Sequence, residues 1–204
     1  MKVIGMCGGS GSGKGTVCSL FLEYNIPSID TDMVYRELTS KTSECLDSLV
    51  ASFGDAILNP EGSLDRAKLA SVVFEGEDSQ VKLNTLNKIA HHYILDKTRK
   101  IITEYKNSGC AAVIVDAPVL FESGFDSECD IILAVIADRD KRIERIIARD
   151  NISKEKAEAR INSQLSDDEL ISRSDIVVYN NGNMNELKNE ISLAVNKIFM
   201  KKTI

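Results

Sequence analysis

Several residue types are scarce in this sequence. Its 204 residues include no tryptophan and only three prolines, too few for a proline-rich linker. The longest apolar runs, at 111–115 and 131–137, fall well short of the roughly 18 residues of a membrane-spanning helix. The opening residues 1–5 lead directly into a glycine-rich segment and lack the pattern of a signal peptide. We therefore expect a cytoplasmic protein with no membrane partner.

Metal-binding and disulfide patterns are also missing. The five cysteines form no C-x-x-C pair, and their odd number in an expected cytoplasmic chain favours free thiols. The two histidines, His91 and His92, are neighbours in sequence and so point to different sides of a helix. Neither residue type predicts a metal centre.

The charge balance argues against a general nucleic-acid binder. The formal net charge is −6, whereas such proteins more often carry a basic surface. With 43% hydrophobic and 27% charged residues, the composition is that of an ordinary folded protein, and the length suits one domain. We expect small-molecule partners and no nucleic acid.

Apolar runs alternate with helical patterns over much of the chain. Buried strands are expected at 2–7, 28–30, 111–116, 130–137 and 175–179. Helical spacing follows at 14–24, then after Asp138 as a predicted cap, and after Asn183 as another. Strand–helix alternation indicates an α/β fold of the P-loop NTPase type, a three-layer α/β/α arrangement around a five-stranded parallel sheet.

Two segments depart from this alternation. Residues 40–110 have a mostly helical pattern with a turn at 59–62, and we interpret them as a helical substrate-binding subdomain. The charged segment 150–173 is interpreted as a lid, with an exposed helical hairpin as the alternative. The whole chain, 1–204, is then a single domain with its core at 1–39 and 111–204.

Residues 8–16, with the sequence G-G-S-G-S-G-K-G-T, resemble a Walker A phosphate-binding loop. Glycines let the backbone N–H groups turn toward phosphate oxygens, the following helix adds its positive end, and Lys14 adds a charge. The loop lies between an apolar strand and an amphipathic helix, which is the context that the motif requires. The predicted nucleotide-binding residues of the loop are Gly9, Ser10, Gly11, Ser12, Gly13, Lys14, Gly15 and Thr16.

One loop position departs from the motif. Gly15 occupies the place of the Ser or Thr whose hydroxyl binds Mg²⁺. We therefore expect Mg²⁺ to be held through phosphates and water, because this ion gives up its waters reluctantly. Thr16 and Asp116 are the alternatives for a protein contact to the metal.

Carboxylates follow two predicted strands. Asp30 and Asp32 come after the second, and phosphoryl transfer to a hydroxyl needs a carboxylate to accept or orient the proton. Asp32 is the candidate base, with a helix-capping residue as the alternative. Asp116 ends the third strand, where it either orients metal-bound water, binds the acceptor, or caps a turn.

Three arginines share one helix face. Arg142, Arg145 and Arg149 lie close together at 100° per residue, and guanidinium groups suit phosphoryl oxygens. A solvated charged face is the alternative.

With these residues in place, the chain resembles the dephospho-CoA kinase family along nearly its whole length. The sequence I-D-T-D-M-V-Y-R at 29–36 is similar to the family's I-D-A-D-x-x-A-R, and D-A-P-V-L-F-E at 116–122 is similar to D-x-P-L-L-F-E. Further matching segments are 53–54, 61–66, 73–74, 86–91, 149–150, 160–161 with 164, and 180–182.

The resemblance implies ATP-dependent phosphorylation of the 3′-hydroxyl of dephospho-CoA, the last step of coenzyme A synthesis. It implies that Asp32, Lys14 and Arg145 are catalytic. It places Arg149 and Asn180 on the ATP side. The acceptor-side residues that it implies are Asp32, Arg36, Arg66, His91 and Asp116.

Four positions differ from the family pattern: Gly15 for serine, Cys7 for threonine, His92 for proline and Tyr179 for an acid. Two other functions stay open from the residues alone. One is a kinase of another acceptor, such as a nucleoside or nucleotide. The other is a non-catalytic protein that binds ATP as a switch, against which the presence of both Lys14 and Asp32 argues.

Overall fold

The computed structural model describes residues 1–200 and divides into two compact units. One unit comprises Met1–Ile29 and the chain from Glu104 onward, and the other comprises Asp30–Thr103. We describe each unit by itself.

A five-stranded parallel sheet organises the first unit. Its strands are β1 (Lys2–Cys7), β2 (Ser28–Asp30), β3 (Ala112–Asp116), β4 (Ile131–Ile136) and β5 (Ile176–Tyr179), in the order β2-β3-β1-β4-β5. The central strand β1 pairs on both sides, so that Gly5 lies opposite Val115 of β3 and Ile132 of β4. The predicted parallel sheet is confirmed, and the segment that follows β1 leaves from the middle of the sheet.

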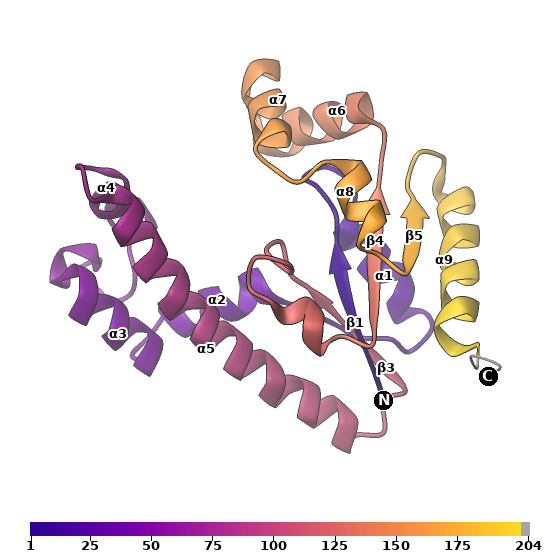
Figure 1. Cartoon of the computed structure of the whole chain (residues 1–204), viewed down its shortest axis with the longest axis horizontal. Helices are drawn as coiled ribbons and strands as arrows, with labels where there is room; N and C mark the ends of the chain where they lie inside the picture. The colour runs from indigo at the N-terminus through magenta and orange to yellow at the C-terminus, as the bar shows by residue number, and fades with distance from the viewer. Residues whose placement is uncertain (201–204) are drawn as a thin grey trace. The chain divides into compact units, whose positions relative to one another are not determined.

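Helices cover both faces of this sheet. On one face α1 (Lys14–Leu22) and α9 (Met184–Phe199) pack on alternate strand residues such as Ile4 and Met6, and α9 runs alongside β5 (Figure 1). On the other face α8 (Asp167–Ser172) contacts β4, and the 3₁₀ helix η2 (Phe125–Glu128) contacts β1. The result is the predicted three-layer α/β/α arrangement.

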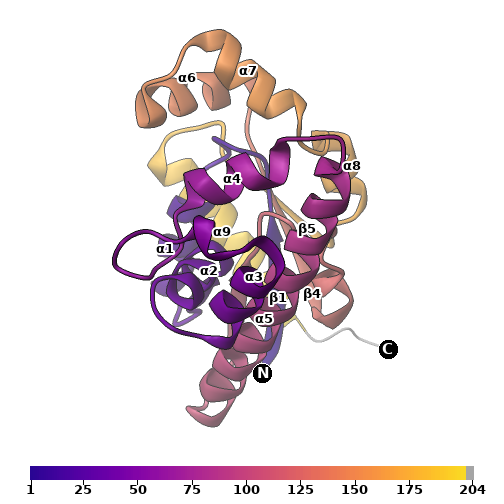
Figure 2. The same cartoon turned by 90° about the vertical axis from the view of Figure 1, so that its left-hand side faces the viewer.

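The arginines predicted to lie near a phosphate all belong to the first of two further helices. Helices α6 (Arg139–Asp150) and α7 (Lys154–Asn162) pack side by side through Ile143, Ile146 and Ile161 (Figures 1 and 2). Asp138 is the N-cap residue of α6, as predicted, but its side chain makes no capping bond. Its backbone N–H instead donates to Asn181 Oδ1 at 2.7 Å, which orients the peptide without turning the carboxylate onto the helix.

The second unit is mainly helical, as its sequence predicted. It contains α2 (Thr31–Thr39), α3 (Glu44–Phe53), the 3₁₀ helix η1 (Asp55–Ile57), α4 (Arg66–Phe74) and most of α5 (Ser79–Asn107). Its core holds Leu49, Ile57 and Val73. The predicted turn at 59–62 is present, since Gly62 N donates to Asn59 O at 3.0 Å. Within residues 1–200, no helix is both long enough and apolar enough to cross a membrane.

Candidate functional site

The loop between β1 and α1 is shaped to bind an anion. Its glycines Gly11 and Gly13 have φ of 78° and 95°, a left-handed conformation that favours glycine. Gly13 is the N-cap of α1 and supplies no side-chain capping bond. The N–H groups of residues 14–16 therefore lack both a carbonyl one turn back and a side-chain cap. These groups and the helix dipole make the start of α1 a phosphate site.

Two cations, Lys14 and Arg145, donate hydrogen bonds to backbone carbonyls at the loop. Lys14 Nζ donates to Gly8 O at 2.7 Å. Arg145 donates to three backbone carbonyls, those of Gly11 (3.1 Å), Ser12 (3.4 Å) and Asn180 (3.1 Å). Because carbonyls do not neutralise a positive charge, both side chains leave positive potential where phosphates would bind.

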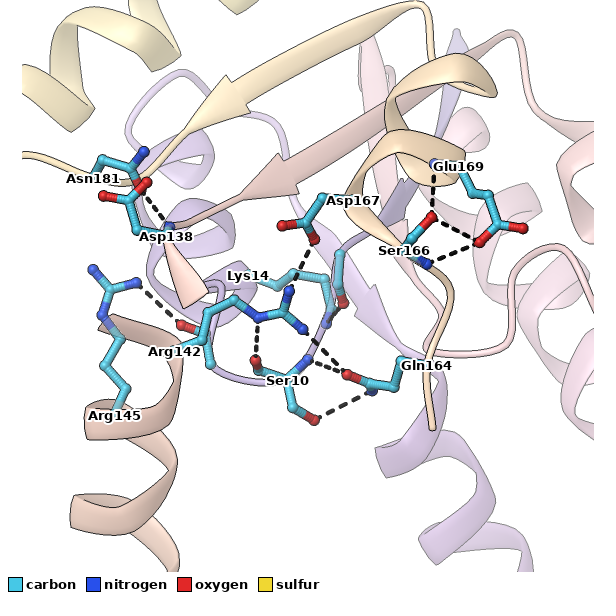
Figure 3. Close-up of polar contacts among 12 residues, drawn as sticks. Ser10, Lys14, Asp138, Arg142, Arg145, Gln164, Ser166, Asp167, Glu169 and Asn181 are labelled. Atoms are coloured by element: carbon cyan, nitrogen blue, oxygen red, sulfur yellow. Dashed lines mark hydrogen bonds and ion pairs between the residues drawn. The ribbon is translucent and has the colours of Figure 1, made fainter. Parts of the chain in front are cut away.

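Arg142 contacts the loop at Ser10, as Figure 3 shows. Its side chain is 4% exposed, Nε donates to Ser10 O at 2.9 Å, and Nη1 pairs with Asp167 Oδ1 at 2.8 Å. Gln164 Oε1 accepts from Ser10 N at 2.8 Å. The sequence placed Arg142 on an arginine face but assigned it no role of its own. The sequence does contain one sign that Arg142 is buried. It lies four residues before the buried Ile146, which places both on the apolar side of α6.

Arg149 pairs with a carboxylate in this structure. Its side chain is 61% exposed and donates to Asp150 from Nε at 2.7 Å and from Nη2 at 2.9 Å. Arg160 pairs with the same carboxylate. Arg149, and after it Arg160, lowers the pKa of Asp150 to about 2. The structure thus joins Arg149 to a lid-segment carboxylate rather than to the loop.

Asn180 is buried against the loop from the end of β5. Its Nδ2 donates to Ser12 O at 2.8 Å. A Cβ on Gly13 would lie 2.2 Å from the same Nδ2, so this position has no room for a side chain unless Asn180 moves. The predicted nucleotide-side residue Asn180 therefore contacts the loop backbone in this structure.

A cavity of about 440 Å³ adjoins the start of the loop. It is lined by Cys7, by the segments 118–122 and 162–165, and by the start of the loop. The Cys7 thiol contacts Ser174 Oγ at 3.7 Å. Burial raises the pKa of Cys7, the nearby Asp116 charge also raises it, and Lys14 opposes both. The segment 118–122 belongs to the sequence stretch predicted to match an acceptor-side motif.

The two residues considered for Mg²⁺ are both oxygen donors. Asp116 ends β3 opposite Met6 of β1, one residue before β1 reaches Cys7. Thr16 is an exposed residue in the first turn of α1. Hard oxygen donors of this kind suit Mg²⁺. Among residues 1–200, no three His, Cys, Asp or Glu side chains form a metal-binding cluster.

In the second unit, the structure decides which aspartate caps α2. The N-cap is Asp30, whose Oδ1 accepts from Asp32 N at 2.9 Å and from Met33 N at 3.1 Å. Asp32 is exposed in the first turn of α2. Arg36 is also exposed and lies four residues on, hence on the same helix face. The capping role considered for Asp32 therefore belongs to Asp30.

The remaining acceptor-side candidates also lie in this unit. Arg66 begins α4, and its guanidinium stacks 5.9 Å from the centroid of the Tyr35 ring. Arg66 Nη2 also donates to Thr39 Oγ1 at 3.4 Å. His91 is half-buried on α5. Arg66 is therefore held close to α2, the helix that carries Asp32 and Arg36.

A phosphate-binding loop on the central strand of a parallel sheet, flanked by lysine and arginine, defines a P-loop kinase. The chain belongs to the dephospho-CoA kinase family, whose sequence pattern matches residues 2–186. It is 38% identical to a dephospho-CoA kinase of Bacillus cereus over 195 residues, covering 96% of each chain.

Solved structures show the same fold. A crystal structure from Thermus thermophilus superposes with a TM-score of 0.80 at 28% identity over 98% of each chain. A dephospho-CoA kinase from Campylobacter jejuni gives a TM-score of 0.69 at 21% identity over 96% of each chain, a likeness of fold alone. ATP as phosphate donor and a small-molecule acceptor follow from membership of this kinase family.

Proposed function

We propose that the chain transfers the γ-phosphoryl group of ATP to the 3′-hydroxyl of the dephospho-CoA ribose, giving CoA and ADP as the final step of coenzyme A synthesis. The observation that carries the proposal is the uncapped start of α1 with Lys14 and Arg145 beside it. This arrangement occurs in a chain whose family matches residues 2–186.

On the donor side, each group has a task set by charge. The N–H groups of residues 14–16 and the Lys14 ammonium bind the β- and γ-phosphate oxygens. Arg145 leaves its carbonyl partners to stabilise the charge that spreads over the transferred group. Arg149 and Asn180 complete the ATP side, with Arg149 exchanging Asp150 for phosphate.

On the acceptor side, Asp32 accepts or orients the proton of the attacking hydroxyl. It follows β2, a strand of the same parallel sheet, and parallel strands present their carboxyl ends at one edge. Arg36, Arg66, His91 and Asp116 bind the anionic and hydroxyl groups of the acceptor.

When bound with ATP, Mg²⁺ would neutralise part of the negative charge of the phosphates. Asp116 or Thr16 would hold it directly or through water.

The segment 150–173 serves as a lid that excludes water, a competing acceptor. Residues 40–110 form the substrate-binding part of one kinase domain. We place the enzyme in the cytoplasm, with small molecules rather than nucleic acid as partners.

The proposal is tested by ADP release from the purified protein with ATP and Mg²⁺, with dephospho-CoA as acceptor. Adenosine, AMP and no acceptor are the parallel arms. Release that depends on dephospho-CoA, with a product of the mass of CoA, supports the proposal. Release with adenosine or AMP alone would establish a kinase of another acceptor. No stimulation by any acceptor would favour the nucleotide-switch function.

Two variants test the catalytic roles. Lys14→Ala should lower turnover about a hundredfold or more through lost phosphate stabilisation. Asp32→Asn should lower it by roughly 10² to 10⁴ through loss of the base. Asp47→Asn, an exposed carboxylate on α3, is the matched control and should leave turnover unchanged. If neither site variant slows ATP consumption, the catalytic assignment is wrong.

A further inference from the structure

Ser10 of the loop is held at all three of its polar groups from outside the loop. Its carbonyl accepts from Arg142 Nε at 2.9 Å, and its N–H donates to Gln164 Oε1 at 2.8 Å. Its hydroxyl accepts from Gln164 Nε2 at 3.3 Å. The Ser10 peptide is thus bound by side chains of α6 and of the α7–α8 connection, as Figure 3 shows.

Arg142 links these holding groups to one another. Besides Ser10, its guanidinium reaches Gln164 Oε1 at 3.5 Å and Asp167 Oδ1 at 2.8 Å. Only a planar, forked group can donate in these directions at once, and a lysine ammonium on a flexible stem lacks that geometry. The Arg142 side chain is 4% exposed while its partner Asp167 is 35% exposed, so a replacement that cannot reach these acceptors removes donors from a partly buried network.

Contact between Arg142 and the loop is close enough to determine its course. A Cβ on Gly9 would lie 2.0 Å from Arg142 Nη2, and one on Gly11 would lie 2.6 Å from Arg142 O. The loop therefore follows the surface of Arg142 at two of its glycines. The ion pair with Asp167 neutralises much of the arginine charge, so the contribution of Arg142 is geometric rather than electrostatic.

We propose that Arg142 is a positioning residue for ATP: with Gln164 and Asp167 it fixes the Ser10 peptide and holds the loop in its phosphate-binding shape. The role rests on the proposed use of the loop for ATP. Because Gln164 and Asp167 lie in the segment 150–173, the same contacts join the proposed lid to the loop.

The test measures binding of a non-hydrolysable ATP analogue by calorimetry, with steady-state kinetics and melting temperature for each variant. Arg142→Lys should weaken analogue binding by roughly tenfold or more, the usual effect of losing a buried charged hydrogen bond. Asp167→Asn should weaken it several-fold. The double variant should be no worse than Arg142→Lys alone, because both changes disrupt one network. KM for dephospho-CoA should not change.

Asp168→Asn is the matched control. Asp168 is an exposed carboxylate in the same first turn of α8, and its loss should leave analogue binding unchanged. If Arg142→Lys does not fold, Asp167→Asn carries the test, since it exchanges one partly exposed oxygen for an amide.

Three outcomes separate this inference from the proposed function. Weakened analogue binding at an unchanged melting temperature supports it. A lower melting temperature with analogue binding within twofold of the parent overturns it and makes Arg142 a residue of stability alone. A parent protein that does not bind the analogue overturns both this inference and the proposed function.

Discussion

At Gly15, neither a positive φ nor a lack of room for a side chain requires the residue to be glycine. Within the described part of the chain, a Cβ built on it meets no atom within 4 Å, and its φ is not positive. Gly11 and Gly13, by contrast, need their left-handed φ, and a Cβ on Gly13 meets Asn180. A serine at position 15 would therefore fit in the first turn of α1 and present a hydroxyl directly after Lys14.

We predict that Gly15→Ser lowers the Mg²⁺ concentration needed for half-maximal turnover, because a hydroxyl there adds a metal ligand. It should also raise stability by up to about 1 kcal/mol, since glycine is a poor helix former. Mg²⁺ titrations of turnover and melting curves measure the two effects. Gly15→Ala is the control, with the helix gain but no hydroxyl. Equal Mg²⁺ dependence in both variants would mean that the hydroxyl does not reach the metal.

Cys7 is a thiol at the start of the loop whose reactivity the structure limits. Burial raises its pKa, so less thiolate is present at pH 8 than in the unfolded chain, and the thiolate is the nucleophile. We predict slow iodoacetamide labelling of Cys7 in the folded protein, rising steadily from pH 8 to 10. Peptide mass spectrometry, with the guanidinium-unfolded chain as reference, measures it. If the native protein is labelled at pH 8 as fast as the unfolded chain, the inference that burial limits the reactivity of Cys7 is wrong.

Among the elements, α2 shows how a cap positions a candidate base. The Asp30 side chain accepts two N–H bonds in the first turn, one of them from Asp32 itself. The sequence placed both carboxylates after a strand and named Asp32 as the candidate base, with helix capping as its alternative role. That choice depends on which residue keeps an extended backbone, as Asp30 does with φ −88° and ψ 111°.

We predict that Asp30→Ala destabilises the protein by about 1 kcal/mol, the usual effect of losing an N-cap. It should also reduce turnover, because the first turn that carries Asp32 loses its restraint. Asp30→Asn keeps a good cap and should stay near the parent in both melting temperature and rate. Asp30→Asn with turnover as low as that of Asp32→Asn would point to a direct chemical role for Asp30 instead.

For the molecule as a whole, the sequence was most informative where buried residues form continuous apolar runs. All five strands were predicted to within one residue at each end, because strands covered on both faces are continuous apolar runs. The network around Arg142 was not predictable in this way. It joins Ser10 to Arg142 and Gln164, which lie 132 and 154 positions away, and no local spacing encodes contacts at that separation. The ion pair between Arg149 and the adjacent Asp150 was likewise not predicted from the sequence.

The two compact units suggest where each substrate should restrain the chain. We predict that a non-hydrolysable ATP analogue slows amide hydrogen exchange at 8–16 and across 150–173, the proposed lid. Dephospho-CoA should slow exchange mainly within Asp30–Thr103. Hydrogen exchange followed by mass spectrometry measures both effects. Helix α9 is the internal control, since it packs on the sheet face opposite α8 and should not respond.

Protection at 8–16 without any at 150–173 would remove the lid role and leave the loop as the nucleotide site. Protection by dephospho-CoA only outside 30–103 would move the acceptor away from Arg36, Arg66 and His91. Because the analogue and the acceptor are added separately, the two assignments stand or fall independently.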